Sequence, residues 1–300
     1  MNGHEMLVLC GMAGVLVAGW ATAARTETPA GAQAEIRLIV RADDLGSSHA
    51  ANEACIKCFR EGIARSIEVM VPGPWYTEAV AMLKDCPGVD VGVHLTLTSE
   101  WEGCKWGPLT RAPSLMDKFG HFFPATSQRP DFPPNTGFLQ AGPKPDEVEK
   151  ELRAQIERAK ADIPQTSHLS VHMGTATATP ELRAIVERLS KEFGLPVEAP
   201  GVKHAPGMGG SKANPQDKET ILAQTLEKLA PGTWLLVEHP GLDVPEMQAL
   251  GHKGYESVAR DRAGVTQAFT SEKVKQVIRA RGIRLISYAD FYGKKQSEQP

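Results

Sequence analysis

The sequence lacks an excess of charge of either sign. It has 33 Lys and Arg residues against 36 Asp and Glu residues, a formal net charge of -3. A protein that binds DNA or RNA through its phosphates needs a basic surface, and this balance supplies none. The composition therefore argues against a nucleic-acid-binding protein.

Long apolar runs are absent after the N-terminus. Residues 6–24 are apolar and rich in small side chains, which is typical of a secretory signal peptide, although residues 1–5 contain no Lys or Arg. We expect residues 1–34 to be a signal peptide and leader, and the protein to be exported to the periplasm or outside the cell. An uncleaved anchor is the alternative, but this Gly- and Ala-rich run is marginal for a membrane span.

Cysteine is scarce as well. Four cysteines follow the leader, and an even number in an exported chain permits one or two disulfides: Cys55, Cys58, Cys86 and Cys104. Cys55 and Cys58 have the spacing of a redox motif, but they fall inside an expected helix. With no second pair of this spacing to complete a zinc site, we interpret both as packing thiols.

Strand and helix patterns alternate along the rest of the chain. Strands are expected at 36–40, 66–71, 89–97, 167–172, 195–199, 232–237 and 284–287, and helices at 47–62, 77–84, 146–162, 180–193, 219–229 and 270–281. No internal repeat or interdomain linker interrupts the alternation. It predicts one α/β domain over residues 35–293, a distorted (β/α) TIM-like barrel of about seven parallel strands, followed by a polar tail at 294–300.

A long segment, residues 99–145, breaks this rhythm and contains most of the large aromatic rings. Loops of this length without secondary structure often form a lid or a binding wall. Aromatic rings suit the flat faces of sugars, so Trp101 and Trp106 are candidate substrate contacts. The alternative is that the rings only anchor the loop to the scaffold.

Ionisable side chains follow four of the expected strands. Asp43 and Asp44 come after the first strand, and three histidines lie at the ends of others: His94, His172 and His239. In (β/α) barrels the chemistry gathers at the carboxyl ends of the strands, so these groups are expected to meet at one rim. Two alternatives stay open: Asp44 as the N-cap of the next helix, and a lone histidine as a hydrogen-bonded core residue.

One carboxylate and two imidazoles form a common three-ligand site for a catalytic divalent cation, magnesium or zinc. Such a cation activates water and polarises a carbonyl oxygen. A second carboxylate next to the ligand, as in the Asp43 and Asp44 pair, can take the proton from that water. His239, on another strand, is placed to protonate a leaving amine.

Three sequence blocks carry a family resemblance. The first is Arg41-Ala42-Asp43-Asp44-Leu45-Gly46 with Asn52 downstream, the second is residues 62–71, and the third is residues 92–98. Together with residues 167–174 and His239-Pro240-Gly241, they resemble the YdjC/ChbG family of carbohydrate deacetylases over residues 36–292.

The resemblance implies a distorted (β/α) barrel, a divalent metal and removal of acetyl groups from N-acetylated sugars such as chitooligosaccharides. It implies metal ligation by Asp44, His94 and His172, a base at Asp43 and an acid at His239. Asn52, as part of the first block, is a candidate substrate contact. One position departs from the family: Ser170 stands where the motif usually has Asp before the ligand histidine, which affects the partner of a metal ligand.

The leading hypothesis is a metal-dependent hydrolase that removes acetyl groups from amino sugars or oligosaccharides by metal-activated water. Two alternatives remain: an exported sugar-binding protein that has lost catalysis, as the Ser170 departure suggests, and a hydrolase of another ester or amide. The sequence does not distinguish a monomer from a homodimer.

Overall fold

The computed structural model describes residues 35–130, 132–197 and 199–293. These residues belong to one compact unit. The predicted signal peptide and leader at 1–34 and the polar tail at 294–300 lie outside the described residues. Among the helices described, none has the length and apolarity needed to cross a bilayer.

Seven strands form one sheet in which every described pairing is parallel. They are β1 (Ile36–Leu45), β2 (Ser66–Val69), β3 (Asp90–Leu95), β4 (Thr166–Val171), β5 (Lys203–His204), β6 (Gly232–Glu238) and β7 (Arg284–Ile286). Their order is β4-β3-β2-β1-β6-β5, with β7 paired to the first half of β1. The edge strands β4 and β5 do not pair with each other, so the sheet is a curled, open half-barrel, which confirms the predicted fold class.

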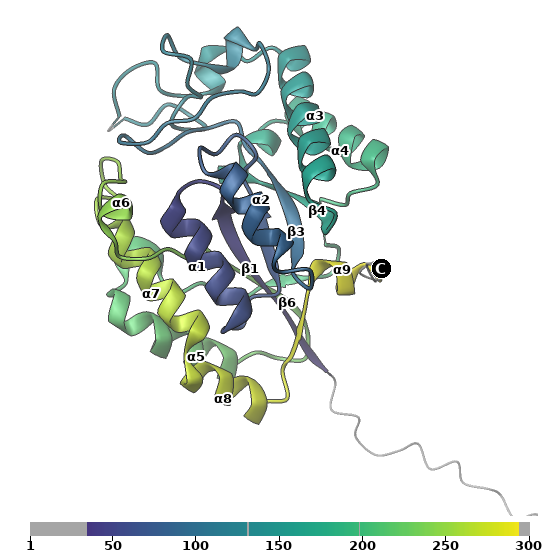
Figure 1. Ribbon diagram of the computed structural model, residues 1–300, viewed down its shortest axis with the longest axis vertical. Coiled ribbons are helices and arrows are strands. Elements are labelled where there is room, and N and C mark those ends of the chain that lie inside the picture. The colour runs from purple at the N-terminus through teal and green to yellow at the C-terminus, as the bar shows by residue number, and fades with distance from the viewer. Residues whose placement is uncertain (1–34, 131, 198, 294–300) are drawn as a thin grey trace, which may run out of the picture. The chain divides into compact units, whose positions relative to one another are not determined.

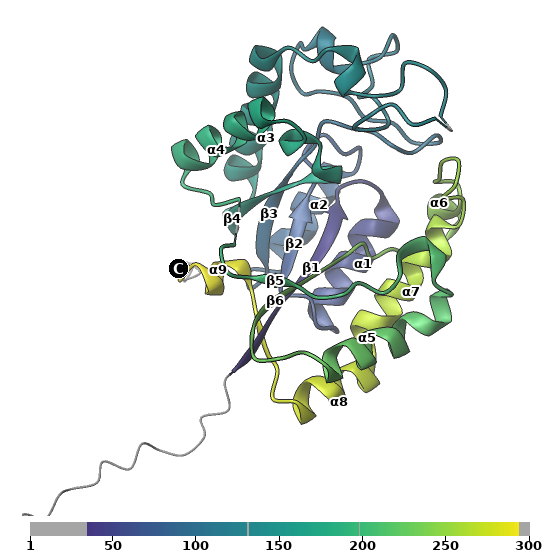
Figure 2. The ribbon, with the colours of Figure 1, turned by 180° about the vertical axis from the view of Figure 1, so that it is seen from behind.

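The central strand β1 is buried along nearly its whole length. Leu38, Ile39 and Val40 have no exposed surface, as expected for a parallel strand covered on both faces. Figure 1 shows α1 and α2 on the near side of the sheet, and in Figure 2, from behind, they lie on its far side. The carboxyl ends of the strands point toward the loop that spans residues 99–144.

Nine helices are found in the described residues. They are α1 (His49–Arg60), α2 (Tyr76–Lys84), α3 (Pro145–Asp162), α4 (Pro180–Phe193), α5 (Lys218–Glu227), α6 (Pro245–Gln248), α7 (Val258–Thr270), α8 (Glu272–Ala280) and α9 (Tyr288–Phe291). The cap of α1 settles one alternative from the sequence. Ser48, whose hydroxyl accepts from the Ala51 N–H, is the N-cap, so Asp44 is not used for capping and is left for other contacts.

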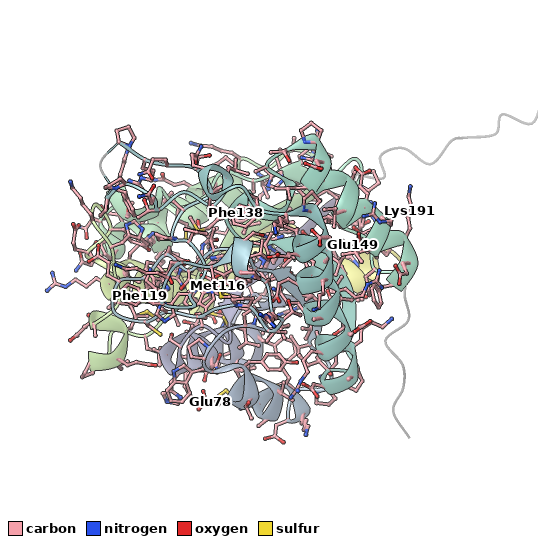
Figure 3. All side chains as sticks on the ribbon, turned by 90° about the horizontal axis from the view of Figure 1, so that it is seen from above. Glu78, Met116, Phe119, Phe138, Glu149 and Lys191 are labelled. Atoms are coloured by element: carbon pink, nitrogen blue, oxygen red, sulfur yellow. The ribbon has the colours of Figure 1, made fainter. Side chains whose placement is uncertain are left out.

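The aromatic rings of the long loop are mostly packed inside. Trp101, Trp106, Phe122 and Phe138 belong to the hydrophobic core, whereas Phe119 is 71% exposed. Figure 3 looks down on this segment, with Phe119 and Phe138 labelled. For the buried rings, anchoring the loop to the scaffold is therefore their first role.

Two features of the structure differ from the expected elements. The described residues of 195–199 form no strand, because Pro196 has no N–H to donate, and pairing with β6 occurs instead at Lys203 and His204. The helices α6, α7 and α9 were not predicted. All four cysteines in the described part of the chain are free thiols, and Cys55 and Cys58 are buried, in agreement with a packing role.

Candidate active site

A β-bulge at the end of β1 turns two adjacent carboxylates toward the same place. In the pairing of β1 with β2, Ala42 lies opposite Ile67 and Leu45 opposite Val69, so Asp43 and Asp44 share a single opposing residue. Asp44 also has a left-handed backbone, with φ of 73°. Neighbouring side chains of a regular strand point to opposite faces, and the bulge with its left-handed residue removes that alternation.

Each of the two carboxylates is held by its own arginine. Arg41 makes a two-pronged ion pair with Asp43, with Nε to Oδ1 at 2.7 Å and Nη2 to Oδ2 at 2.8 Å. Arg262, on α7, donates from Nη2 to Oδ2 of Asp44 at 2.7 Å. The paired charges allow both carboxylates to stay buried at the carboxyl end of the sheet.

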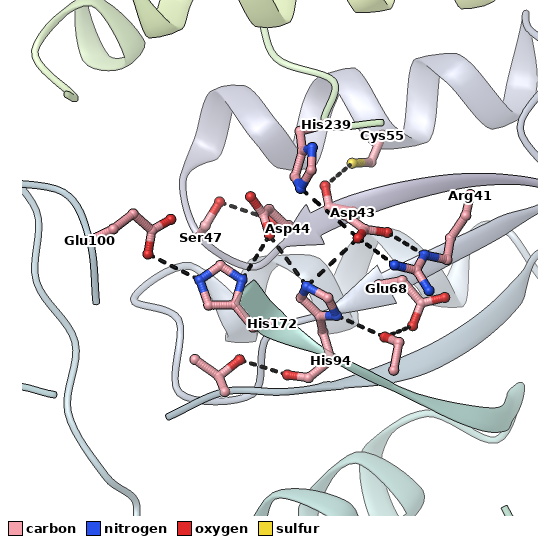
Figure 4. A network of polar contacts seen from close by, with 12 residues as sticks. Arg41, Asp43, Asp44, Ser47, Cys55, Glu68, His94, Glu100, His172 and His239 are labelled. Carbon is pink, nitrogen blue, oxygen red and sulfur yellow. Dashed lines mark hydrogen bonds and ion pairs between the residues drawn. The ribbon is translucent and has the colours of Figure 1, made fainter. Parts of the chain in front are cut away.

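The three predicted ligands meet at one point. Oδ1 of Asp44 lies 3.7 Å from Nε2 of His94 and 3.4 Å from Nδ1 of His172. One ligand atom from each residue lies within 4.8 Å of the other two. Figure 4 shows the three side chains converging from β1, β3 and the end of β4.

The residues present fit a divalent cation. Oδ1 of Asp44 is buried and receives no hydrogen bond from any residue that the structure describes, whereas Oδ2 is held by Arg262. A buried carboxylate oxygen without a donor is costly, and a cation between Asp44, His94 and His172 would satisfy it. One carboxylate oxygen and two imidazole nitrogens suit zinc well and other divalent cations acceptably.

Burial and charge set the protonation of these groups. Burial alone would raise the pKa of Asp44, but Arg262, followed by His239 and His172, holds that pKa well below its usual range. Burial lowers the pKa of His94 to about 4, so its ring is neutral at neutral pH and can offer a lone pair. Burial also acts to lower the pKa of His172, but Glu100 and Asp44 raise that pKa to about 10.

Each ligand histidine has a second polar partner at its other ring nitrogen. Nδ1 of His94 lies 2.7 Å from the hydroxyl of Ser170, and Nε2 of His172 lies 3.0 Å from Oε2 of Glu100. Such partners fix the ring orientation of metal-binding histidines. The sequence reading missed Glu100, although a carboxylate just beyond a buried strand was a visible signal.

The predicted base and acid face each other across the site. Nε2 of His239 lies 4.0 Å from Oδ2 of Asp43, and the His239 side chain is 44% exposed (Figure 4). Asp43 itself is almost fully buried. Because His239 is partly exposed beside the buried Asp43, its imidazole can reach a substrate from the solvent side.

A cavity of about 380 Å³ opens beside His239. Its lining includes two of the three metal-ligand candidates, Asp44 and His172, and several other polar and aromatic side chains: Glu100, Trp101, Glu238, His239 and Arg262. Trp101 therefore borders this cavity, and its contact with a substrate stays a prediction. Its ring stacks on His252 and lies 5.0 Å from the Arg262 guanidinium carbon.

The other two predicted substrate contacts occupy different positions. Trp106 does not line this cavity: its indole donates to the Thr98 carbonyl and its edge packs on His172, 6.4 Å between ring centroids. Asn52 is fully buried and braces the turn after Asp44, because its Oδ1 accepts from the Gly46 N–H at 2.6 Å. Direct contact of Asn52 with a substrate is at odds with that burial.

Known proteins with similar sequences are carbohydrate deacetylases, the class that the sequence motifs resemble. A carbohydrate deacetylase of Thermus thermophilus is 32% identical over 71% of this chain and 80% of its own length. A carbohydrate deacetylase of Brevibacillus brevis is 26% identical over 85% of this chain and 100% of its own length.

A solved structure from Enterococcus faecalis, described as a candidate cellobiose-phosphate cleavage protein, shares the fold. Its TM-score is 0.67 at 21% identity, with 85% of this chain and 98% of that chain covered. The family profile described as YdjC-like protein matches residues 37–280. That match includes both aspartates and all three histidines of the site, and the chain belongs to the YdjC-like family.

Proposed function

We propose that the protein is a metal-dependent carbohydrate deacetylase that removes acetyl groups from N-acetylated amino sugars or their oligosaccharides. The observation that carries the proposal is the convergence of Asp44, His94 and His172, whose ligand atoms lie within 4.8 Å of one another. Relatives named carbohydrate deacetylases, at up to 32% identity, support the substrate class.

The protein's own residues would hold a divalent cation and leave room for the reactants. Asp44 would bind through Oδ1, His94 through Nε2 and His172 through Nδ1, the atoms that face one another. A divalent cation, zinc or magnesium, supplies an activated water and polarises a carbonyl oxygen when bound. Three protein ligands leave positions open for water and for the acetyl group.

Asp43 and His239 would move the protons. Asp43, oriented by Arg41, takes a proton from the attacking water, whose oxygen forms a bond to the acetyl carbon. The C–N bond then breaks, acetate leaves, and His239 donates a proton to the sugar nitrogen. The half-exposed position of His239, 4.0 Å from Asp43, suits contact with a leaving group on the cavity side.

Acetate release from N-acetylglucosamine oligomers tests the proposal. The full chain supplied with zinc or magnesium should release acetate, and Asp44→Asn, which removes a ligand charge without changing side-chain size, should not. A wild-type protein that releases no more acetate than Asp44→Asn with either cation contradicts the proposal. Binding of the oligomers without release would favour the sugar-binding alternative, and release from acetate esters alone would favour another hydrolase.

The place of action proposed is outside the cytoplasm. Its support is the apolar run at residues 6–24, followed by small residues that suit a signal-peptide cleavage site. N-terminal sequencing of the protein from fractionated cells tests this. We expect a mature N-terminus produced by cleavage between Ala23 and Ala34 in the exported fraction, and an intact Met1 in the cytosol would contradict it.

A further inference from the structure

A buried carboxylate lies one hydroxyl group away from a ligand histidine. Glu68, on β2, is fully buried, and its Oε2 accepts a short hydrogen bond from the hydroxyl of Ser170. The same hydroxyl lies 2.7 Å from Nδ1 of His94. Figure 4 shows Glu68 and His94 side by side below the two aspartates.

The direction of these hydrogen bonds follows from the chemistry of the ring. Nε2 of His94 faces Asp43 and Asp44, so it must be unprotonated to bind a cation. The ring proton then resides on Nδ1 and is donated to the Ser170 oxygen. That oxygen in turn donates its own hydrogen to Glu68, a carboxylate that can only accept.

The side chain of Glu68 is held by His168 and fits only because a glycine lies next to it. Its second oxygen, Oε1, lies 2.7 Å from Nε2 of His168 on β4. The neighbouring residue on β3 is Gly92, where a Cβ would lie 2.1 Å from Oε2 of Glu68 and 2.5 Å from Nε2 of His168. Any larger residue at position 92 would displace the carboxylate, so Gly92 is part of the same arrangement.

Glu68 also lies opposite the β-bulge of β1 in the sheet. It comes between Ile67 and Val69, the partners of Ala42 and Leu45, and therefore opposite the bulge that carries Asp43 and Asp44. The carboxylate thus reaches the site from the strand next to β1, while Ser170 reaches it from β4. Three neighbouring strands, β2, β3 and β4, contribute one group each to a single chain of hydrogen bonds.

We propose that Glu68, acting through Ser170, is a positioning residue that fixes the tautomer and the ring orientation of His94 for cation binding. This inference rests on the proposed cation site. Ser170 itself offers only a hydroxyl to Nδ1 of His94, and Glu68 supplies the carboxylate behind that hydroxyl from a different strand. Partners of this kind typically change metal affinity by about 10- to 100-fold.

A rescue variant separates this role from a general structural one. Asp at position 170 would bring its own carboxylate to Nδ1 of His94, and Ser170 borders a cavity of about 500 Å³ that gives the larger side chain room. Ser170→Asp should therefore restore zinc binding in the Glu68→Gln background. In the wild-type background it should weaken binding, because two carboxylates would then meet at one buried place.

The experiment measures the zinc dissociation constant of the full chain by competition calorimetry. Ser170→Ala and Glu68→Gln should each bind zinc about 10- to 100-fold more weakly, and the double variant Glu68→Gln/Ser170→Asp should bind within a few-fold of wild type. Ser66→Ala is the matched control. It removes a buried hydroxyl on β2 that donates to Asp90 and touches no ligand histidine, and zinc affinity should not change.

The outcomes separate the positioning role of Glu68 and Ser170 from the existence of the cation site. Ser170→Ala and Glu68→Gln proteins that bind zinc as tightly as wild type would overturn the positioning role and leave the cation site standing. Weakened binding without rescue by Ser170→Asp would also overturn it, in favour of a structural effect. A wild-type protein that binds neither zinc nor magnesium would overturn the cation site and this inference together.

Discussion

Asp43 and Asp44 are adjacent in the sequence and differ in what surrounds them. Both oxygens of Asp43 are engaged by Arg41, whereas Asp44 has one oxygen on Arg262 and one that accepts nothing from the described residues. The oxygen without a donor makes Asp44, rather than Asp43, the candidate ligand. Asp43, next to it and held by its ion pair with Arg41, is left for proton transfer.

Replacement of Asp43 by Asn should therefore separate binding from turnover. Asp43→Asn keeps the size of the side chain but removes the base, so we expect kcat for acetate release to fall by about 10²- to 10⁴-fold. Zinc affinity should change little, because the ligand atoms are untouched. Steady-state kinetics with calorimetry of zinc binding provide the measurement, and an unchanged kcat would remove Asp43 from the role of base.

The pH dependence of stability should report on Glu68. Four charged or titratable side chains interact with it, from β1, β3, β4 and α9: Arg41, His94, His168 and Tyr288. Burial alone would raise the pKa of Glu68, but His168 above all lowers that pKa from 4.5 to about 2. Because the pKa is lowered in the folded state, its contribution to stability is complete above pH 4.5 and is lost as the pH falls toward 2.

We therefore expect the difference in unfolding free energy between wild type and Glu68→Gln to shrink as the pH is lowered from about 6 to about 3. Urea titrations at each pH measure it. The comparison cancels the titration of other carboxylates, since both proteins carry them. A difference that stays constant or grows toward low pH would show that Glu68 is not ionised in the folded protein.

At the scale of elements, the position of α7 determines the charge of the site. Arg262 reaches Asp44 because α7 packs close to the segment around Pro215. Gly264 permits this approach, since a Cβ there would lie 2.7 Å from the Pro215 carbonyl oxygen. The same glycine weakens the helical pattern of the sequence, which explains why α7 was not predicted.

Loss of Arg262 should make the stability of the protein depend more strongly on a bound cation. In Arg262→Met, Asp44 keeps a buried charge without its ion-pair partner, which costs about 3–5 kcal/mol when nothing replaces it. Bound zinc would compensate part of that charge, so zinc should stabilise the variant more than it stabilises wild type. Urea unfolding in chelator and in zinc measures both effects.

Arg260→Met is the matched control for this prediction. Arg260 lies on the same helix with its side chain in solvent, and its replacement should leave both measurements close to wild type. Equal stabilisation of Arg262→Met and wild type by zinc would mean that Arg262 does not offset the charge of Asp44.

The sequence predicted those parts of the site that depend on strand ends. Asp44, His94 and His172 each follow a buried apolar run, and parallel strands bring their carboxyl ends to one edge. Groups that arrive from the middle of a strand or from a helix were not predictable in this way. Glu68, inside β2, and Arg262, inside α7, acquire their roles only through the packing of elements distant in sequence.

Asn52 and the loop tryptophans show a related limit. A polar residue after a motif suggests a substrate contact. The side chain of Asn52, however, accepts from the Gly46 N–H and donates to the Trp75 carbonyl. Composition cannot separate a ring that lines a cavity from one that packs behind it, because both are buried. Trp101 and Trp106 have nearly the same exposure and opposite relations to the cavity.

On the scale of the whole molecule, the candidate cation site joins segments far apart in the chain. Its ligands come from positions 44, 94 and 172, on strands β1 and β3 and just beyond β4. No disulfide joins the described part of the chain, so packing and hydrogen bonds alone hold these strands in register. A cation bound by all three would add a cross-link that exists only in the folded state.

Cation binding should therefore stabilise the entire domain. A ligand at 100 times its dissociation constant that binds only the folded chain adds about 2.7 kcal/mol. For a domain of this size that raises Tm on the order of 5–10 °C. Thermal unfolding of the full chain, first stripped with chelator and then titrated with zinc, measures the shift. Asp44→Asn should show almost none, and a wild-type Tm indifferent to chelator, zinc and magnesium would mean that the three side chains meet without binding a cation.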